Sequence, residues 1–472
     1  MLHTREFSSF AVIFENRKMV KSRETLNQVL SLMTVLLNEL SLGLGSGWIA
    51  PTLKLLRTSA VGNLVLTMEE CSWIASLDHF GKIFGAILAA IFLDITGRKN
   101  LLMYCALLFF LQWVLILFGN SAMVLYIARI AFGVAFGIND GTNSVYLGEN
   151  SSPLIRGIFG AVAISLNFLG LMAEIALGTY ASYRTTAAVN TAITFLCVLS
   201  VFWMKEPVQY LIMRGKYQKA EKNFLWLRGV TDVSQVKSEF EKITQNVHSE
   251  NTKKSSIRTV LTSRANYKSV TIMFVIYALA ASTGYYPIIS FASLFFTETN
   301  MLTADELTIL IGVFQFVIIS STSIIVDRFP RRTIIMVSFS CIALVHAGTA
   351  LIYYVHHNIV PVPYFPWLIF IGVSLFVGLH AFVYPAIFLI RSELFPLSIK
   401  AIGGCISVVG YAALSFLTTK MFLYIYQFYG FYLNFLIFSA ISLLLVLYVY
   451  WVLPETRNKS LVEIQEDLER KK

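Results

Sequence analysis

The segment DITGRK, residues 94–99, separates two long apolar runs at residues 72–93 and 101–118. About 20 apolar residues are enough to cross the hydrocarbon core of a bilayer as a helix. Gly97 can adopt backbone angles that other residues resist, which suits so tight a turn. Arg98 and Lys99 mark the turn as cytoplasmic under the positive-inside rule. The segment therefore indicates two membrane-spanning helices joined by a short cytoplasmic loop.

A second turn of this kind, DRFPRR at residues 327–332, joins another pair of apolar runs. Its aspartate, Asp327, follows Asp94 by 327 − 94 = 233 residues, which is about half of the 472-residue chain. Internal repeats of this size are how many secondary transporters are built. We therefore predict a chain made of two related halves.

The composition is typical of a protein that crosses the membrane many times. The chain is 56% hydrophobic and 14% charged, whereas a soluble protein carries about 25% charged residues. The net charge of +10 is interpreted as a mark of topology and of anionic lipid headgroups, because the basic residues lie in loops on one side. No nucleic-acid partner is expected. The scattered cysteines predict neither a disulfide framework nor a metal site.

We predict an all-α integral membrane protein with about twelve spans in two six-helix bundles, residues 29–204 and 268–453. The hydrophilic linker at 205–267 contains YQKAEKNFLWLR (217–228), whose spacing predicts an amphipathic helix on the cytoplasmic face. An even number of spans leaves both termini, residues 1–28 and 454–472, in the cytoplasm. The predicted spans are 29–50, 72–93, 101–118, 122–143, 157–179, 185–204, 268–293, 305–326, 333–355, 366–390, 399–424 and 430–453.

Charged residues recur at the cytoplasmic helix ends of both halves. Glu149 precedes Arg156 by seven residues, and Glu393 precedes Lys400 by the same number. Opposite charges there can bridge neighbouring helices and close the inward side reversibly, because exposed pairs contribute only roughly 0–1 kcal/mol each. The alternative is that the charges only anchor topology, but the doubled pattern favours a gate. The predicted gate residues are Asp94, Arg98, Lys99, Glu149, Arg156 and Glu206 in the first half and Asp327, Arg331, Arg332, Glu393 and Lys400 in the second.

Arg129 lies inside the fourth predicted span, where a charge is costly and requires a partner or a water-filled cavity. It begins the pattern Arg129-x-x-x-Gly133-x-x-x-Gly137, and the two glycines allow another helix to approach closely. Two roles remain open for this arginine. It either forms a buried ion pair that sets the packing of the helices, or takes part directly in gating.

The second predicted span carries three ionisable residues in a row of five, Asp78, His79 and Lys82. Asp78 and Lys82 are four residues apart, hence on one helix face, and can pair with each other. An ion or proton site, a contact for a charged solute and a self-neutralising pair all remain open. Glu39 is a further unusual acid, in the first span.

Two lone histidines, His346 and His380, lie in the ninth and tenth spans. Such residues are more often hydrogen-bonded packing groups than functional ones. His380 lies one turn before Tyr384 and Pro385. We expect Pro385 to break the tenth helix, and broken helices are where transporters bend and bind.

Several of these segments together resemble the sugar porters of the major facilitator superfamily over nearly the whole chain. Trp73 and the sequence TTK at 418–420 are most similar to the insect facilitated trehalose-transporter branch. The resemblance implies two six-helix bundles around a central cavity, working by alternating access without ATP. The segments that carry it are DITGRK (94–99), RIAFGVAFG (129–137), YLGENSSPLIRG (146–157), VDRFPRR (326–332), SELFPLSIK (392–400) and PETRNKSL (454–461).

The departures from the family pattern fall in the substrate cavity. Two glutamines that bind sugar hydroxyls in relatives are replaced here by Ala280 and Ala281, ahead of Gly284. A site without such hydrogen bonds should discriminate poorly among hydroxyls, so the resemblance leaves hexose or trehalose open as substrate. The other replaced positions are Tyr286 and Tyr411 for asparagines, Ile164 for a glutamine and Phe388 for a tryptophan.

The predicted cavity is therefore aromatic and hydroxyl-bearing. Proton-coupled relatives carry an aspartate in the first span, but the matching position here is about Leu44, so coupling of that kind is not expected. The predicted cavity residues are Ile164, Asn167, Ala280, Ala281, Gly284, Tyr285, Tyr286, Ser290, His380, Tyr384, Phe388 and Tyr411.

The sequence as a whole predicts a facilitative carrier for a small polar solute, a sugar first, in the plasma membrane. One alternative is a porter of the same fold for a non-sugar or charged solute, in which Lys82 and His380 would matter. Another is a non-transporting sensor. No HExxH, nucleophile elbow or P-loop is present, so the chain is not expected to be an enzyme. No cofactor and no obligate protein partner are expected beyond the solute and the lipid bilayer.

Overall fold

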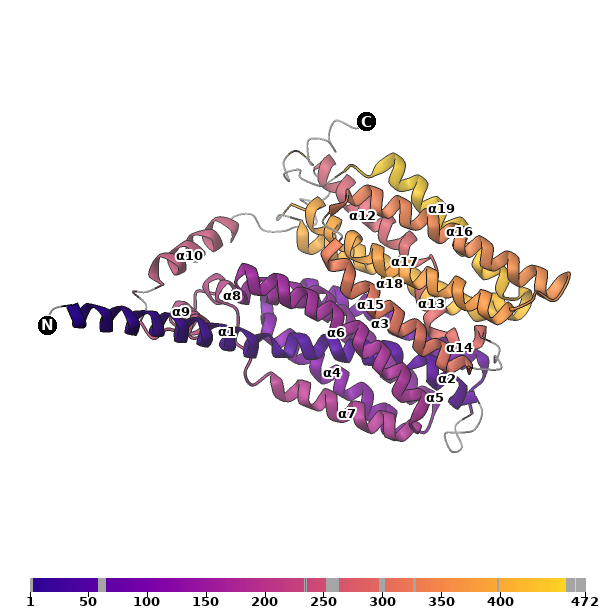
Figure 1. Cartoon of the computed structure of the whole chain (residues 1–472), viewed down its shortest axis with the longest axis horizontal. Coiled ribbons are helices and arrows are strands. Elements are labelled where there is room, and N and C mark those ends of the chain that lie inside the picture. Colours follow the sequence, from indigo (N-terminus) through magenta and orange to yellow (C-terminus); the bar gives the residue numbers. More distant parts are fainter. Residues whose placement is uncertain are drawn as a thin grey trace.

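The structure is a computed structural model of two helical bundles joined by short linker helices (Figure 1). It describes residues 3–57, 65–232, 234, 236–251, 263–296, 302–325, 328–396, 399–455 and 463, without the side chains of residues 3–22, 54, 153–154, 249–251, 293, 323–325 and 392. Asp327 of the predicted gate lies outside the described residues.

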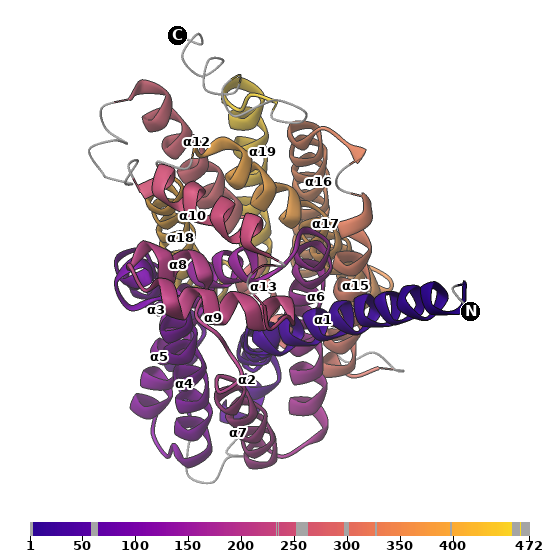
Figure 2. The same cartoon turned by 90° about the vertical axis from the view of Figure 1, so that its left-hand side faces the viewer.

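In the described part of the chain, the N half has seven helices. They are α1 (His3–Gly47), α2 (Ile49–Arg57), α3 (Met68–Thr96), α4 (Arg98–Phe118), α5 (Ala122–Asn150), α6 (Pro153–Tyr180) and α7 (Tyr183–Ser200). The linker forms α8 (Val208–Met213), α9 (Tyr217–Arg228) and α10 (Lys237–Asn251), which lie across the ends of the long helices (Figure 2). The helix predicted at 217–228 is confirmed as α9.

The C half follows with α12 (Arg264–Ala281), α13 (Tyr285–Ser290), α14 (Ala292–Phe295), α15 (Ala304–Ile325), α16 (Arg331–Asn358), α17 (Phe365–Leu394), α18 (Lys400–Tyr429) and α19 (Phe431–Val452). Among the described residues, eleven helices are long and apolar enough to cross a membrane. The 18-residue α7 takes the place of the sixth predicted span. The all-helical prediction is confirmed.

Glycines set the closest helix crossings of the N half. A Cβ atom on Gly133 of α5 would lie 2.0 Å from the carbonyl oxygen of Asp78 on α3, and one on Gly85 of α3 would lie 2.2 Å from that of Val134 on α5. The same device joins α1 to α6, where a Cβ on Gly43 would lie 1.9 Å from the carbonyl oxygen of Asn167. Small residues let two backbones approach closely without a clash, as the sequence predicted for Gly133.

One expectation about a helix break is wrong, and one break was not expected. The seventh predicted span contains the unexpected break, because α12 ends at Ala281 and Gly284 adopts a φ of +96° before α13 begins. Glycine tolerates that left-handed backbone, which other residues avoid. In contrast, α17 continues through Pro385. It packs along α15 and α16, and such neighbours allow membrane helices to tolerate a proline.

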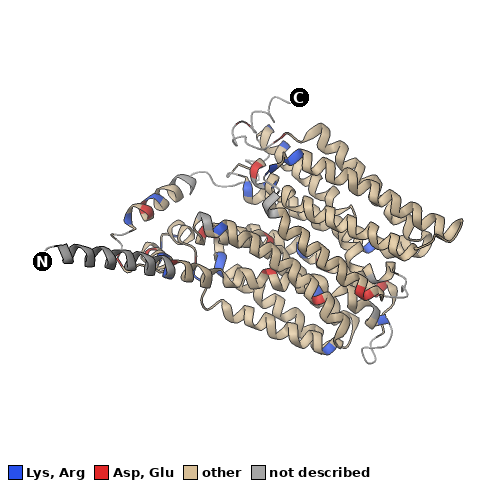
Figure 3. Cartoon of the chain, viewed as in Figure 1, with Lys and Arg blue, Asp and Glu red and all other residues tan. Residues whose placement is uncertain are grey.

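The two halves meet along two helix pairs, α3 with α18 and α6 with α15. The Ser72 hydroxyl donates to the carbonyl oxygen of Lys420 at 2.9 Å, and the Cys405 thiol donates to that of Ala86 at 3.5 Å. In addition, α13 and α14 contact α2. The charged residues gather at the ends of the long helices, and few lie along their middles (Figure 3). Those few are the starting point for the site.

Candidate functional site

Two ion pairs connect α3 with α5 inside the N half. Arg129 Nη2 lies 2.7 Å from Asp78 Oδ2, and the guanidinium also donates to the carbonyls of Ile74 and Gly45. Lys82 Nζ lies 3.1 Å from Asp140 Oδ2. The expected pairing of Asp78 with Lys82 is therefore wrong. The glycine crossing brings α5 so close to α3 that each charge finds a partner on the other helix.

Arg129 thus has the partner that its position in the span requires. That partner is Asp78, and both side chains are buried. An arginine that satisfies a carboxylate and two carbonyls has most of its donors occupied. This arrangement supports the packing role for Arg129. His79, next to Asp78, is also buried and faces the C half, where its ring lies 4.2 Å from that of Tyr286.

Glu39 of α1 is held by three amides, and no cation pairs with it among the described residues. Asn139 and Asn143 of α5 donate to its Oε1 at 2.9 and 2.6 Å, and Asn167 of α6 donates to its Oε2 at 3.2 Å. We call Glu39 and these three asparagines the Glu39 cluster. It contains the predicted cavity residue Asn167, and it stabilises a carboxylate in a position where ionisable groups are costly. Ile164, also predicted, lies half-buried on α6.

The facing wall of the C half is aromatic, as expected from the sequence. The Tyr285 and His380 rings stack with centroids 4.1 Å apart, and Tyr411 lies edge-on to Tyr286 at 6.0 Å. Tyr384 is 39% exposed, although it lies in the middle of α17. The structure therefore brings most of the predicted aromatic cavity residues together.

Four other predicted cavity residues are packed against the surrounding protein. Ala280, Ala281 and Ser290 are buried, and Gly284 lies against the ring of Phe438. The other lone histidine, His346, is buried with its Nε2 3.1 Å from the carbonyl oxygen of Thr283, which agrees with a packing role.

Arg98 is the centre of the predicted gate in the N half. Its guanidinium makes two contacts of 3.1 Å to Glu149 and one of 3.0 Å to Asp94. Glu206 accepts the backbone N–H groups of Arg98 and Lys99 at the start of α4. Burial raises the pKa of Glu206 above its ordinary value, and these N–H donors oppose that rise. The site thus joins α3, α4 and α5 at one end of the bundle.

The C half repeats this arrangement with different residues. Arg331 Nε lies 3.6 Å from Glu393 Oε1, and Arg332 donates to the carbonyl of Tyr450. Glu455 accepts the backbone N–H groups of Arg331 and Arg332 at the start of α16, as Glu206 does at the start of α4. Each of these ion pairs joins helices within one half.

Two predicted gate residues have other surroundings. Arg156 donates to the carbonyls of Gly148 and Ser151, while Glu149, seven residues earlier, contacts Arg98. Glu149 pairs with Arg98 because Arg98 lies at the end of α4 that is nearest to Glu149. Lys400, at the start of α18, lies within electrostatic reach of Arg391, which carries a like charge.

Sequence reasoning missed several charged and polar residues of the interior. Asp140 and Arg391 lie within electrostatic reach of each other across the two halves. A charge within an apolar span was a sufficient signal for Asp140, whereas Arg391 lies one residue beyond the predicted span 366–390. Asn139 and Asn143 gave no such signal, because uncharged amides are common in helices. Glu455 is the fifth missed residue, because the comparison of the two turns ended at Arg332.

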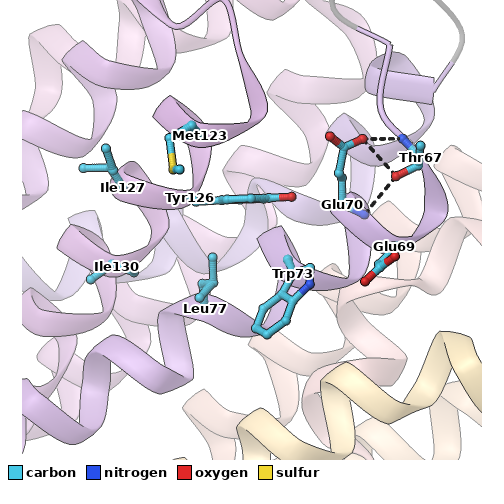
Figure 4. Close-up of a pocket in the computed structure, with 9 residues that line it drawn as sticks. All are labelled: Thr67, Glu69, Glu70, Trp73, Leu77, Met123, Tyr126, Ile127 and Ile130. Atoms are coloured by element: carbon cyan, nitrogen blue, oxygen red, sulfur yellow. Dashed lines mark hydrogen bonds between the residues drawn. The ribbon is translucent and has the colours of Figure 1, made fainter.

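A separate groove of about 620 Å³ lies between the first turns of α3 and α5 (Figure 4). Glu70, Trp73 and Tyr126 line it, with Met123 and Ile127 among its apolar residues. The Glu70 carboxylate accepts both the backbone N–H and the hydroxyl of Thr67, which caps α3. Its own helix therefore uses this carboxylate, and Trp73 places the groove next to the interface between the halves through its contacts with Phe416 and Lys420 on α18.

The chain matches the model of the sugar (and other) transporter family over residues 15–468. It is 25% identical to a facilitated trehalose transporter from Apis mellifera ligustica, over 93% of this chain and 87% of that protein. A Bombyx mori facilitated trehalose transporter is 23% identical over 93% of this chain and 86% of that protein.

Solved structures of the E. coli xylose transporter XylE have the same fold. A partially occluded inward-open form superposes with a TM-score of 0.73 at 20% identity, over 92% of this chain and 99% of that one. XylE bound to 6-bromo-6-deoxy-D-glucose, described as a proton:xylose symporter, gives a TM-score of 0.73 at 17% identity, over 94% and 100%. The two-bundle architecture predicted from the sequence is thereby confirmed.

Proposed function

Because this chain belongs to the sugar (and other) transporter family, we propose that it carries a small neutral sugar, trehalose or a hexose, across the plasma membrane. The movement is facilitative and proceeds by alternating access, with both termini and the linker helices in the cytoplasm. Similarity over nearly the full length to facilitated trehalose transporters supports a sugar as the transported solute.

The observation that carries the proposal is the pair of matching ion-pair clusters at the predicted gate residues of the two halves. Arg98–Glu149 in the N half and Arg331–Glu393 in the C half occupy equivalent helix ends, and Glu206 and Glu455 hold the following backbone N–H groups in both. Each half is therefore a rigid unit at that end. Two rigid units that meet along α3–α18 and α6–α15 can rock about those helix pairs, which is how such carriers alternate.

The linker is fastened to the N half in a way that fits this movement. Arg228 of α9 pairs with Glu24 of α1 at 2.9 Å and with Glu239 of α10, and Asn27 donates to the carbonyl of Trp226 at 2.6 Å. The helices α8 and α9 also bury a small apolar cluster of their own. The linker therefore moves with the N half.

The test is uptake of labelled trehalose and glucose into cells that express the chain, with and without an imposed proton gradient. The control is the double variant Arg98→Ala/Arg331→Ala, with surface labelling and thermal unfolding to show that it is folded and delivered. Saturable uptake that is lost in the variant and indifferent to the proton gradient would support the proposal. No sugar uptake by wild-type protein at the surface would overturn it.

A second candidate is a carrier for a charged solute, which the interior charges favour. Lys82, Asp140 and Arg391 lie at the interface of the halves within electrostatic reach of one another. Uptake of labelled sugar that is unaffected by excess organic anions or amines would exclude it.

A further inference from the structure

The Glu39 cluster retains hydrogen-bond acceptors that no described residue uses. A carboxylate offers about four acceptor positions, and the three asparagines fill three of them. Asn143 is 7% exposed, yet its Oδ1 has no hydrogen-bond partner in the described part of the chain. Buried polar atoms are normally paired, so two adjacent free acceptors are a place for donors that a bound solute supplies.

The electrostatics of the cluster favour a neutral donor. Two other interior carboxylates of the N half have cationic partners, Arg129 for Asp78 and Lys82 for Asp140. Glu39 has amides alone among the described residues, and Asp140 is its charged neighbour. Lys82 and Arg391 both lie near Asp140 and oppose the approach of an amine. A hydroxyl group donates to Glu39 without adding a charge.

The opposite wall supplies the second contact that a carrier needs. Tyr384 of α17 lies within electrostatic reach of both Glu39 and Asp140, and its phenol is both a donor and an acceptor. This side chain is 39% exposed. A solute held between Glu39 and Tyr384 would touch both halves at once.

We propose that the Glu39 cluster is a hydroxyl-binding subsite that recognises a neutral polyhydroxylated solute from the N half, opposite the aromatic wall of the C half. The inference rests on the proposed function, and it specifies that the N half recognises the hydroxyl groups of the solute. Ala280 and Ala281 leave α12 without polar side chains at those positions, so the C half contributes rings and phenols, while the N half contributes the acceptors.

The test is equilibrium binding of labelled glucose and trehalose to the full chain in lipid nanodiscs. Glu39→Gln keeps the size of the side chain but removes its charge and one acceptor oxygen. We expect about tenfold weaker sugar binding, the cost of one charge-assisted hydrogen bond. The matched control is Glu174→Gln. Glu174 is a fully buried carboxylate of the same half that accepts from Asn190 at 2.6 Å between α6 and α7, and its variant should bind as the wild type does.

A series of monodeoxyglucoses adds a measurement on the wild-type protein, which does not depend on how the variant folds. A site built to accept a hydroxyl rejects the analogue that lacks it. At least one deoxy position should weaken binding to the wild type about tenfold, and that penalty should shrink in Glu39→Gln.

The outcomes separate the inference from the function on which it rests. Equal binding of sugar by wild type and Glu39→Gln, or equal binding of every deoxy analogue by the wild type, would overturn the subsite and leave sugar transport standing. A wild type that binds choline but neither sugar would overturn both.

Discussion

At the scale of single residues, the interior charges of this chain take their partners from neighbouring helices. Arg129 is fully enclosed, and its guanidinium contacts one carboxylate and two carbonyls. Desolvation of an ion pair costs much of its attraction, so the pair contributes little to net stability. Removal of only one of the two partners is destabilising, because the remaining charge stays buried without a counter-charge.

Replacement of Asp78 by alanine should therefore destabilise the fold by about 3–5 kcal/mol, the cost of an uncompensated buried charge. The measurement is thermal or denaturant unfolding of the detergent-solubilised protein. The double variant Asp78→Leu/Arg129→Met removes both charges and should recover most of the loss. If the double variant were as unstable as Asp78→Ala, the ion pair would not be the reason.

At the scale of elements, glycines decide which helices lie against each other. The crossing of α3 and α5 has a backbone-to-backbone contact at Gly133, where a Cβ would lie 2.0 Å from the Asp78 carbonyl oxygen. Gly148 is on the same helix, and a Cβ there meets nothing within 4 Å. The two glycines thus have the same helix propensity penalty but different surroundings.

Gly133→Ala should force α3 and α5 apart and lower both stability and transport, since overpacking of a tight contact costs about 1–3 kcal/mol. Gly148→Ala should be neutral or stabilise the helix by up to about 1 kcal/mol. Unfolding midpoints and sugar uptake measured side by side check this. Equal effects of the two substitutions would contradict the close crossing.

At the scale of the whole molecule, one group of contacts between the halves joins the beginning of α3 to the C-terminal half of α18. The Lys420 ammonium lies 4.0 Å from the ring centre of Trp73, and the Trp73 ring lies 6.2 Å from that of Phe416. These contacts are at the end of α3 opposite the predicted gate residues Asp94 and Arg98. They hold the halves together at the far end, where a carrier must open to admit solute from the other side.

Lys420→Met should weaken this contact and shift the population toward the outward-open form. A cation–π contact contributes roughly 0.5–2 kcal/mol, which corresponds to a shift of roughly 2–30-fold. The shift can be measured as faster labelling of an introduced cysteine, Tyr286→Cys, by an impermeant maleimide added outside the cell. Trp451→Leu, an exposed tryptophan on α19, serves as the control and should leave the labelling rate unchanged. An unchanged rate in Lys420→Met as well would rule out this contact as a latch.

The sequence by itself determined the number of long helices, the division into two halves and the ends at which charges gather. Apolar length and the position of Arg and Lys are local properties, so the turns at DITGRK and DRFPRR were enough. It also placed Arg98, Glu149, Arg331 and Glu393 at matching helix ends, and the structure brings them into two ion pairs.

Only the tertiary structure decided the partners. Asp78 could reach Lys82 along its own helix, yet the glycine crossing presents Arg129 and Asp140 from α5, and the shorter contacts form there. The same reason hid the Glu39 cluster, since its four members are spread over α1, α5 and α6. Residues distant in the chain become neighbours through the packing of whole helices, and periodicity within one helix carries no record of that packing.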